Sequence, residues 1–276
     1  MKKQLFLIFQ AAFGLPLFMA LVPICQAAQS QNPNDFAPPA VFQAAGTTAS
    51  SIQSSVDQFR AALGDPNNGN TGPHASGRRE INWDGGNPNI IATTDPVTPF
   101  NVFLNTRGAQ FTTPGLGLSQ ATPSGIAVLF GNPTYGTTFS TFSPSRLFTP
   151  VGSNITEALF FQPGTNGAVP ATVSGFGAVF TDVDKPDGSG PSKKRGNRGA
   201  STLIEYFGAD GKVLFSSFVP ASPGDGSLSF FGIVFDEPLI ARVRITTGDT
   251  VPGPDDDEKQ DIVMMDDFIY GEPQPR

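Results

Sequence analysis

Residues 261–271 have the sequence DIVMMDDFIYG, and this stretch decides the fold class. Its side chains alternate between two sets, as they do along a β-strand, and each set is apolar except for one aspartate, Asp266 or Asp267. A strand that is apolar on both faces is covered on both sides. We therefore expect a central strand whose two carboxylates need partners, because burying a charge without a partner is unfavourable.

Further apolar runs between turn signals predict a series of short strands. In LIARVRIT (239–246) apolar and basic residues alternate, which is typical of a strand with one buried face and one wet or ion-paired face. Asp210-Gly211 separates two apolar runs, a strong hairpin signal. IAVLF (126–130) is also expected to be a strand. The pattern predicts an all-β fold, a two-sheet antiparallel sandwich that is jelly-roll-like.

The beginning of the chain predicts export. Residues 1–28 contain two lysines, a long apolar run and small residues at Ala27 and Ala28, which is the layout of a secretory signal peptide. The single cysteine, Cys25, offers a lipid-modified terminus as the alternative, which the bulky Ile24 before it disfavours. We expect a secreted, extracellular protein without a membrane span after cleavage, with the periplasm or cell surface as other destinations.

Three segments are expected after the signal peptide. Residues 29–50 are rich in Ala, Gln, Asn, Pro and Thr and predict a flexible leader. Residues 51–64 predict a short amphipathic helix, and residues 76–272 the β-sandwich domain. The helix would begin at Ser51, end at Gly64 and bury one apolar face, made of Ile52, Val56, Phe59 and Leu63.

Composition limits the functional classes. The chain has 17 Lys and Arg against 24 Asp and Glu, so nucleic acid is not an expected partner. The only histidine, His74, lies in a Pro/Gly/Ser loop, which gives no support to a Ser-His-Asp triad or a zinc site. A polysaccharide-acting glycosidase or lyase stays an alternative, since a glycosidase needs only two carboxylates.

Four aspartates are the candidate metal ligands: Asp182, Asp184, Asp266 and Asp267. Charges in apolar strands require either ion pairs or a bound cation. Arginines from 242–244 or 78–79 are one set of possible partners. A structural Ca²⁺ ion shared between the loop and the last strand is the other explanation.

The motif GRREINWDGG (77–86) contains the only tryptophan, Trp83. Ile81 and Trp83 alternate as an expected buried pair, which favours a core tryptophan over a platform for stacking a sugar. Arg78, Arg79 and Asp84 are expected to bracket the acidic cluster. The motif is thus predicted to be a structural latch, with a ligand-binding pocket as the alternative.

The chain also resembles a family of exported, functionally uncharacterised bacterial β-sandwich proteins, over residues 56–273. The similarity lies in FRAALG, GRREINWDG, RLFTP, GFGAVFTDVD, IEYFGADGKVL, FFGIVFD, IARVRITTG and VMMDDFIYGEP. The resemblance implies secretion and a jelly-roll-like fold, and it implies no reaction. Related exported proteins often carry a sorting tail with an apolar helix, which we do not expect here after GEPQPR.

These observations predict a secreted, non-catalytic module that binds a ligand at the cell surface or in the matrix. Carbohydrate is the leading ligand class, with a glycan or another cell-surface polymer as the partner. The alternatives are a polysaccharide-acting enzyme and a purely structural envelope protein.

Overall fold

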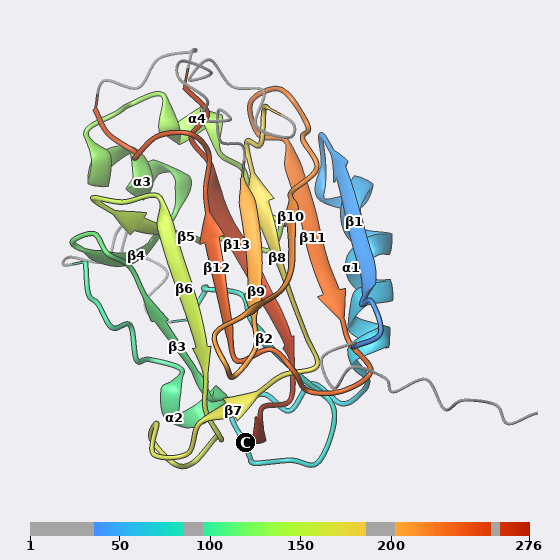
Figure 1. Cartoon of the computed structure of the whole chain (residues 1–276). Helices are drawn as coiled ribbons and strands as arrows, with labels where there is room; N and C mark the ends of the chain where they lie inside the picture. Colours follow the sequence, from blue (N-terminus) through green and yellow to red (C-terminus); the bar gives the residue numbers. More distant parts are fainter. Residues whose placement is uncertain (1–35, 86–95, 186–201, 255–259) are drawn as a thin grey trace, which may run out of the picture. The chain divides into compact units, whose positions relative to one another are not determined.

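The computed structural model of the chain describes residues 36–85, 96–185, 202–254 and 260–276 (Figure 1). The expected signal peptide and the first part of the expected leader lie outside these residues. From Ala37 onward the chain forms one compact unit. No helix in the described ranges is long and apolar enough to span a membrane.

Two antiparallel sheets make up most of this unit. Sheet A has the strand order β1 (Ala40–Gly46), β11 (Leu228–Val234), β8 (Gly175–Thr181), β13 (Met264–Gly271), β5 (Leu147–Val151) and β4 (Gly117–Ala121), with β2 (Arg78–Ile81) also paired to β13. Sheet B has the order β10 (Val213–Phe218), β9 (Leu203–Phe207), β12 (Arg242–Thr246), β6 (Ile155–Phe160) and β3 (Ala109–Thr112). A two-stranded ribbon pairs β14 (Gln274–Pro275) with β7 (Ala171–Thr172).

The main core lies between the two sheets and is rich in aromatic rings. Trp83 is 1% exposed at its centre and stacks on Phe148, with a ring-centroid separation of 3.7 Å. Phe111 of sheet B and Phe268 of sheet A meet the same indole edge-on. Aromatic pairs of this kind add to the stabilisation that burial provides. Trp83 therefore packs as a core residue that ties the end of β2 to both sheets.

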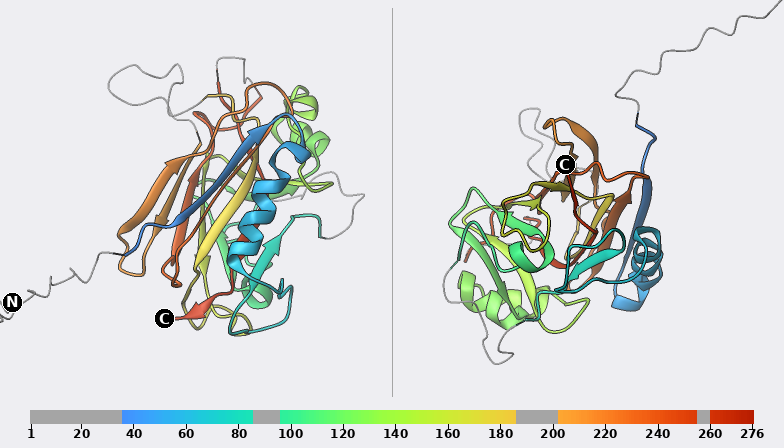
Figure 2. Two further views of the ribbon diagram at one scale, coloured as in Figure 1. Left: turned by 90° about the vertical axis from the view of Figure 1, so that its right-hand side faces the viewer. Right: turned by 90° about the horizontal axis from the view of Figure 1, so that it is seen from below.

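Helix α1 (Ala49–Leu63) covers the other face of sheet A (Figure 2). Its buried residues are Ile52, Val56, Phe59 and Leu63. The helix begins after Thr48, two residues earlier than expected, and ends at Gly64 with φ 90°. The Phe59 ring lies on two paired glycines, Gly177 and Gly232, where an added Cβ would come within 2.9 Å of it. The missing side chains thus let the helix lie close to the sheet.

Two segments differ from the sequence-based expectation. The composition of residues 29–50 predicts a flexible leader, but residues 40–46 form β1, and each of them pairs with a residue of β11. IAVLF was expected to be a strand, but it belongs to helix α3 (Pro123–Phe130). Thr122 caps this helix by accepting a hydrogen bond from the Gly125 N–H, and Gly131 ends it with φ 66°. The short helices α2 (Leu104–Arg107) and α4 (Tyr135–Thr138) complete the fold.

Strand β13 is the centre of sheet A, and all eight of its residues are buried. One of its edges pairs with β8. The other edge is shared, because β5 pairs at Met265 and β2 pairs from Phe268 onward. Asp266 and Asp267 therefore lie at the point where one neighbouring strand gives way to the other.

Candidate functional site

The two aspartates of β13 occupy a β-bulge. Between Met265 and Phe268 the strand has one residue more than the facing segment of β8, from Phe180 to Ala178. An extra residue interrupts the regular alternation of side chains and leaves part of the ladder unpaired. This explains how two adjacent carboxylates can both be buried in a central strand.

At the bulge, the carboxylates of Asp266 and Asp84 bind the backbone of the loop of residues 142–146. Asp266 Oδ2 accepts hydrogen bonds from the backbone N–H groups of Phe142 and Ser143, at 2.6 and 3.3 Å. Asp84 Oδ1 accepts from the N–H groups of Ser145 and Arg146, the latter at 2.9 Å. Backbone N–H groups are obligatory donors that need acceptors when they are buried. The two acids therefore anchor this loop across the bulge.

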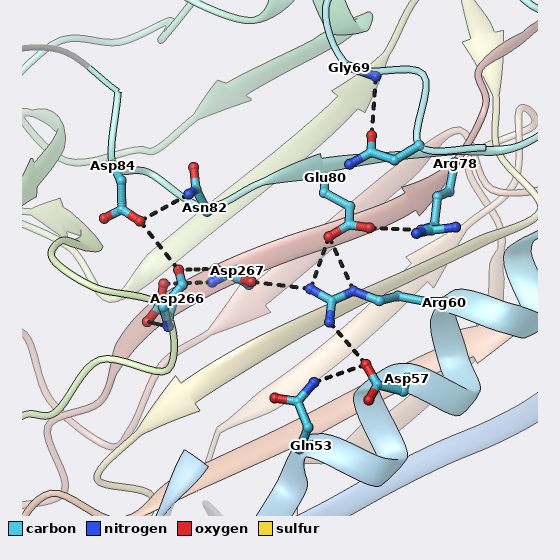
Figure 3. Close-up of polar contacts among 12 residues, drawn as sticks. Gln53, Asp57, Arg60, Gly69, Arg78, Glu80, Asn82, Asp84, Asp266 and Asp267 are labelled. Carbon is cyan, nitrogen blue, oxygen red and sulfur yellow. Dashed lines mark hydrogen bonds and ion pairs between the residues drawn. The ribbon is translucent and has the colours of Figure 1, made fainter. Parts of the chain in front are cut away.

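Asp267 connects the bulge to helix α1 (Figure 3). Its Oδ1 accepts a hydrogen bond from the Ser143 hydroxyl, and its Oδ2 lies 3.6 Å from an Arg60 guanidinium nitrogen. Arg60 also donates to Glu80 of β2 at 2.9 and 3.1 Å. One arginine thus joins the helix, β2 and β13.

Burial raises the pKa of both bulge aspartates. For Asp266 the desolvation of the carboxylate is the main cause, and the neighbouring charge of Asp267 raises the pKa further. For Asp267 desolvation also comes first, while the Ser143 hydroxyl and the Arg60 charge oppose it. Asp266 is 0% exposed and Asp267 is 4% exposed. Both carboxylates are therefore buried, and they hold the loop of residues 142–146 and Arg60.

The two arginines of the opening motif pair with glutamates. Arg79 is fully buried and donates through Nε and a terminal nitrogen to the two carboxylate oxygens of Glu272, the second bond measuring 2.7 Å. Arg78 is bound to Glu80 and Asp65. Of the motif's residues, Asp84 joins the bulge network through the loop of residues 142–146, and Glu80 joins it through Arg60.

Asp182 and Asp184 lie in a different network from the bulge. Asp182 directly follows β8 and has φ 70°, and its N–H donates to the Ser227 carbonyl. Asp184 accepts from the Gly224 N–H, and its own N–H donates to Asp261. Asp261 precedes β13, five residues before Asp266, which is roughly 16 Å along an extended chain.

The expected calcium site can be compared with these positions. Within the described ranges, no group of three or more His, Cys, Asp or Glu residues has an arrangement that could hold a metal ion. The bulge pair and the Asp182–Asp184 pair share no hydrogen-bond partner in the contacts described above. Calcium at these residues stays a prediction, which thermal melting can test.

The outer face of sheet B is a surface that the sequence reasoning did not single out. Its side chains form two cross-strand rows, each containing residues of five strands. One row is Gln110, Leu159, Arg242, Phe207 and Val213, and the other is Thr112, Glu157, Arg244, Glu205 and Ser216. The alternation in LIARVRIT indicated a wet face, but the neighbours of its arginines follow only from the strand register.

Charged, polar and apolar side chains lie next to one another on this outer face. Glu157 pairs with Arg244 at 2.7 Å and also with Arg242. The Arg242 guanidinium lies 3.8 Å from the centroid of the Phe207 ring, a cation–π contact. Val213 at the sheet edge is 53% exposed. The face therefore offers donors, acceptors and apolar carbon on one surface.

Comparison of the chain with protein-family models, with curated proteins and with solved structures found no match.

Proposed function

We propose that the chain is a secreted, non-catalytic carbohydrate-binding module, and that the outer face of sheet B is its binding surface. The observation that carries the proposal is the pair of neighbouring cross-strand rows, one in which Gln110 and Arg242 alternate with apolar side chains and one made of polar and charged side chains. Five strands at about 4.8 Å spacing make a surface about 19 Å across. A surface of this width suits an extended polymer.

The chemistry of the face matches that of a sugar. Carbohydrates present hydroxyl groups, which both donate and accept hydrogen bonds, and they present C–H patches. Arg244 and Gln110 supply donors, and Glu157 and Glu205 supply acceptors. Leu159 and the exposed edge of the sheet supply apolar contact. The Glu157 ion pairs hold Arg242 and Arg244 in place before a ligand arrives, which reduces the entropy lost on binding.

The jelly-roll assignment belongs to the same proposal. Eight strands in chain order (β5, β6, β8, β9, β10, β11, β12, β13) divide into two four-stranded sets. The sets have the neighbour orders β5-β13-β8-β11 and β6-β12-β9-β10. This arrangement supports a jelly roll, an architecture that lectin domains also use.

A glycan array followed by affinity titration tests the proposal. Arg242→Ala and Glu205→Ala should each weaken binding by at least about tenfold, equivalent to about 1.4 kcal/mol. Gln58→Ala is the matched control, because Gln58 is exposed on α1, on the other side of sheet A. Equal affinities in all variants would reject this surface. Binding to no polysaccharide would reject the function and favour the structural envelope protein.

One observation favours an enzyme as the second candidate. Glu157 and Glu205 flank Arg244 in the same cross-strand row, so two carboxylates lie on one open face. Glycoside hydrolysis requires a pair of carboxylates on either side of the bond that is cleaved. Release of reducing sugar by the wild type, and its loss in Glu157→Gln and in Glu205→Gln, would support hydrolysis. No release from any bound polysaccharide would favour the non-catalytic module.

A further inference from the structure

We propose that β1 is a docking edge for a second copy of this chain, and that two copies join through their β1 strands into one continuous antiparallel sheet. β1 is the first strand of sheet A, and its one neighbour is β11 (Figure 1). Among the described residues, no other strand or bridge pairs with its outer side. The unpaired N–H and C=O groups of such an edge are a template for another strand.

The opposite side of the sandwich shows how this chain closes an edge. Val97 exchanges backbone hydrogen bonds of 2.9 and 3.2 Å with Leu118 of β4, the last strand of sheet A. Phe100 exchanges bonds of 2.7 and 3.2 Å with Phe111 of β3, the last strand of sheet B. Residues 97–100 thus cover the edges of both sheets. The part of the chain that the structure describes has no corresponding segment beside β1.

The other open edge, β10 of sheet B, carries protection that β1 lacks. Its register shifts between Val213 and Phe215, and the side chain of Lys212 directly before it is 69% exposed. Bulges and lysines discourage an edge strand from pairing with another chain. β1 pairs with β11 without a shift from Ala40 to Gly46, and it contains no proline and no charged residue. We therefore place the contact at β1.

A second copy of the chain suits this edge because the strand is complementary to itself. β1 has seven residues, AVFQAAG, and Gln43 is the central one. When two antiparallel copies overlap completely, Gln43 faces Gln43 of the second copy across a two-fold axis. Phe42 then faces Ala44, and Val41 faces Ala45. A larger side chain thus meets a smaller one in these cross-strand pairs, and the two amides at the axis can both donate and accept hydrogen bonds.

The two faces of β1 are also consistent with this pairing. Phe42 and Ala44 pack with the core under α1, so the helices of both copies would lie on one face of the continuous sheet, and both B sheets on the other. Val41 points to the opposite face from Phe42 and is 45% exposed, so pairing would cover apolar surface that one copy leaves in water. Residues 36–56 contain no charged side chain, so this stretch brings no like charges together.

Sedimentation velocity of the purified protein tests the proposal. The wild type should form a dimer whose proportion rises with concentration. Gln43→Lys and Gln43→Glu should each weaken the dimer by at least about tenfold, since equal charges would face each other at the axis. An equimolar mixture of these two variants should restore the dimer, which a folding defect would not allow. Gln58→Lys, on the exposed side of α1, is the matched control and should leave the dimer unchanged.

Two results of this experiment would overturn the proposal. One is a wild type that stays monomeric at high micromolar concentration. The other is a dimer that Val213→Lys dissociates and Gln43→Lys does not, because β10 would then be the contact.

Disulfide trapping tests the register independently. In a Cys25→Ser background, Gln43→Cys should give a covalent dimer on mild oxidation. Residues directly opposite each other in an antiparallel pair have Cα atoms about 4.5–5.5 Å apart, which a disulfide can span. Gln58→Cys, in the same background, should stay monomeric on a non-reducing gel. Equal cross-linking of the two variants would reject the two-fold axis at Gln43.

Discussion

The buried ion pair between Arg79 and Glu272 offers the sharpest test of how the opening motif stabilises the fold. The side chains are 0% and 1% exposed. Glu272 accepts two hydrogen bonds from Arg79, one from the Asn68 amide at 2.8 Å and one from the His74 N–H at 3.1 Å. The carboxylate therefore fixes β2, the loop before it and the end of the chain.

Glu272→Ala should lower the free energy of unfolding by about 3–5 kcal/mol, because it leaves the arginine buried without a counter-charge. Urea unfolding followed by the fluorescence of Trp83, the only tryptophan, measures this change. Asp57→Ala is the matched control: Asp57 pairs with Arg60 at 3.2 Å, but its side chain is 57% exposed, so we expect a loss below about 1 kcal/mol.

The double variant Arg79→Met, Glu272→Leu separates the two contributions. Replacing both charges with apolar groups removes the unpaired arginine, so it should recover much of the lost stability. The reasoning is refuted if Glu272→Ala costs no more than the Asp57 control. It is also refuted if the double variant is less stable than Glu272→Ala, since the loss would then not come from an uncompensated charge.

Four further predictions concern the core, the helix, pH and calcium. Trp83→Ala should destabilise the fold by about 3–5 kcal/mol in urea unfolding, as loss of a buried aromatic does, and a smaller loss than about 1 kcal/mol would contradict its place in the core. Gly232→Val should cost about 1–3 kcal/mol, because its side chain would displace the ring of α1 that lies on this glycine, and unchanged stability would argue against that close packing. Asp261 has a pKa of about 7 in the folded state and an ordinary value of 3.8 in the unfolded chain, so between these values the folded state holds a proton that the unfolded chain has released. The free energy of unfolding should therefore decrease as the pH rises from about 4 to 7, by at most about 1.4 kcal/mol per pH unit. Asp261→Asn should reduce this dependence of stability on pH. If calcium is bound, the melting temperature should rise with calcium relative to chelator and the rise should disappear in Asp182→Asn or Asp267→Asn, whereas identical wild-type melts would reject a stabilising metal.

The strands with clear alternation could be predicted because the pattern of apolar and polar side chains lies within the strand itself and does not depend on distant residues. LIARVRIT corresponds to β12, where Val243 and Ile245 are buried and the two arginines face outward. The doubly apolar stretch DIVMMDDFIYG contains β13, with sheet B on one side and α1 near the other. In both cases the side chains of one strand carry enough information to place it.

β1 and α3 show two different reasons for a wrong prediction. AVFQAAG has little intrinsic preference for a strand, and it becomes one by pairing along its whole length with β11, a partner far away in the sequence. For α3 the signal was present: Thr122 and Pro123 are typical of a helix start, and Gly131 of a helix end. The apolar run between them is too short for its period to separate helix from strand.

Which acid meets which base could not be derived from the sequence, because it depends on strand register. A shift of one residue in β12 would turn Arg242 and Arg244 into the core and remove the Glu157 pairs from the surface. Arg60, which approaches Asp267, comes from a helix whose apolar face gave no reason to select it. The bulge at Asp266 and Asp267 changes the register again, within the strand itself. Charge partners in this protein are therefore a consequence of the assembled sheets, whereas the need for partners is visible in DIVMMDDFIYG.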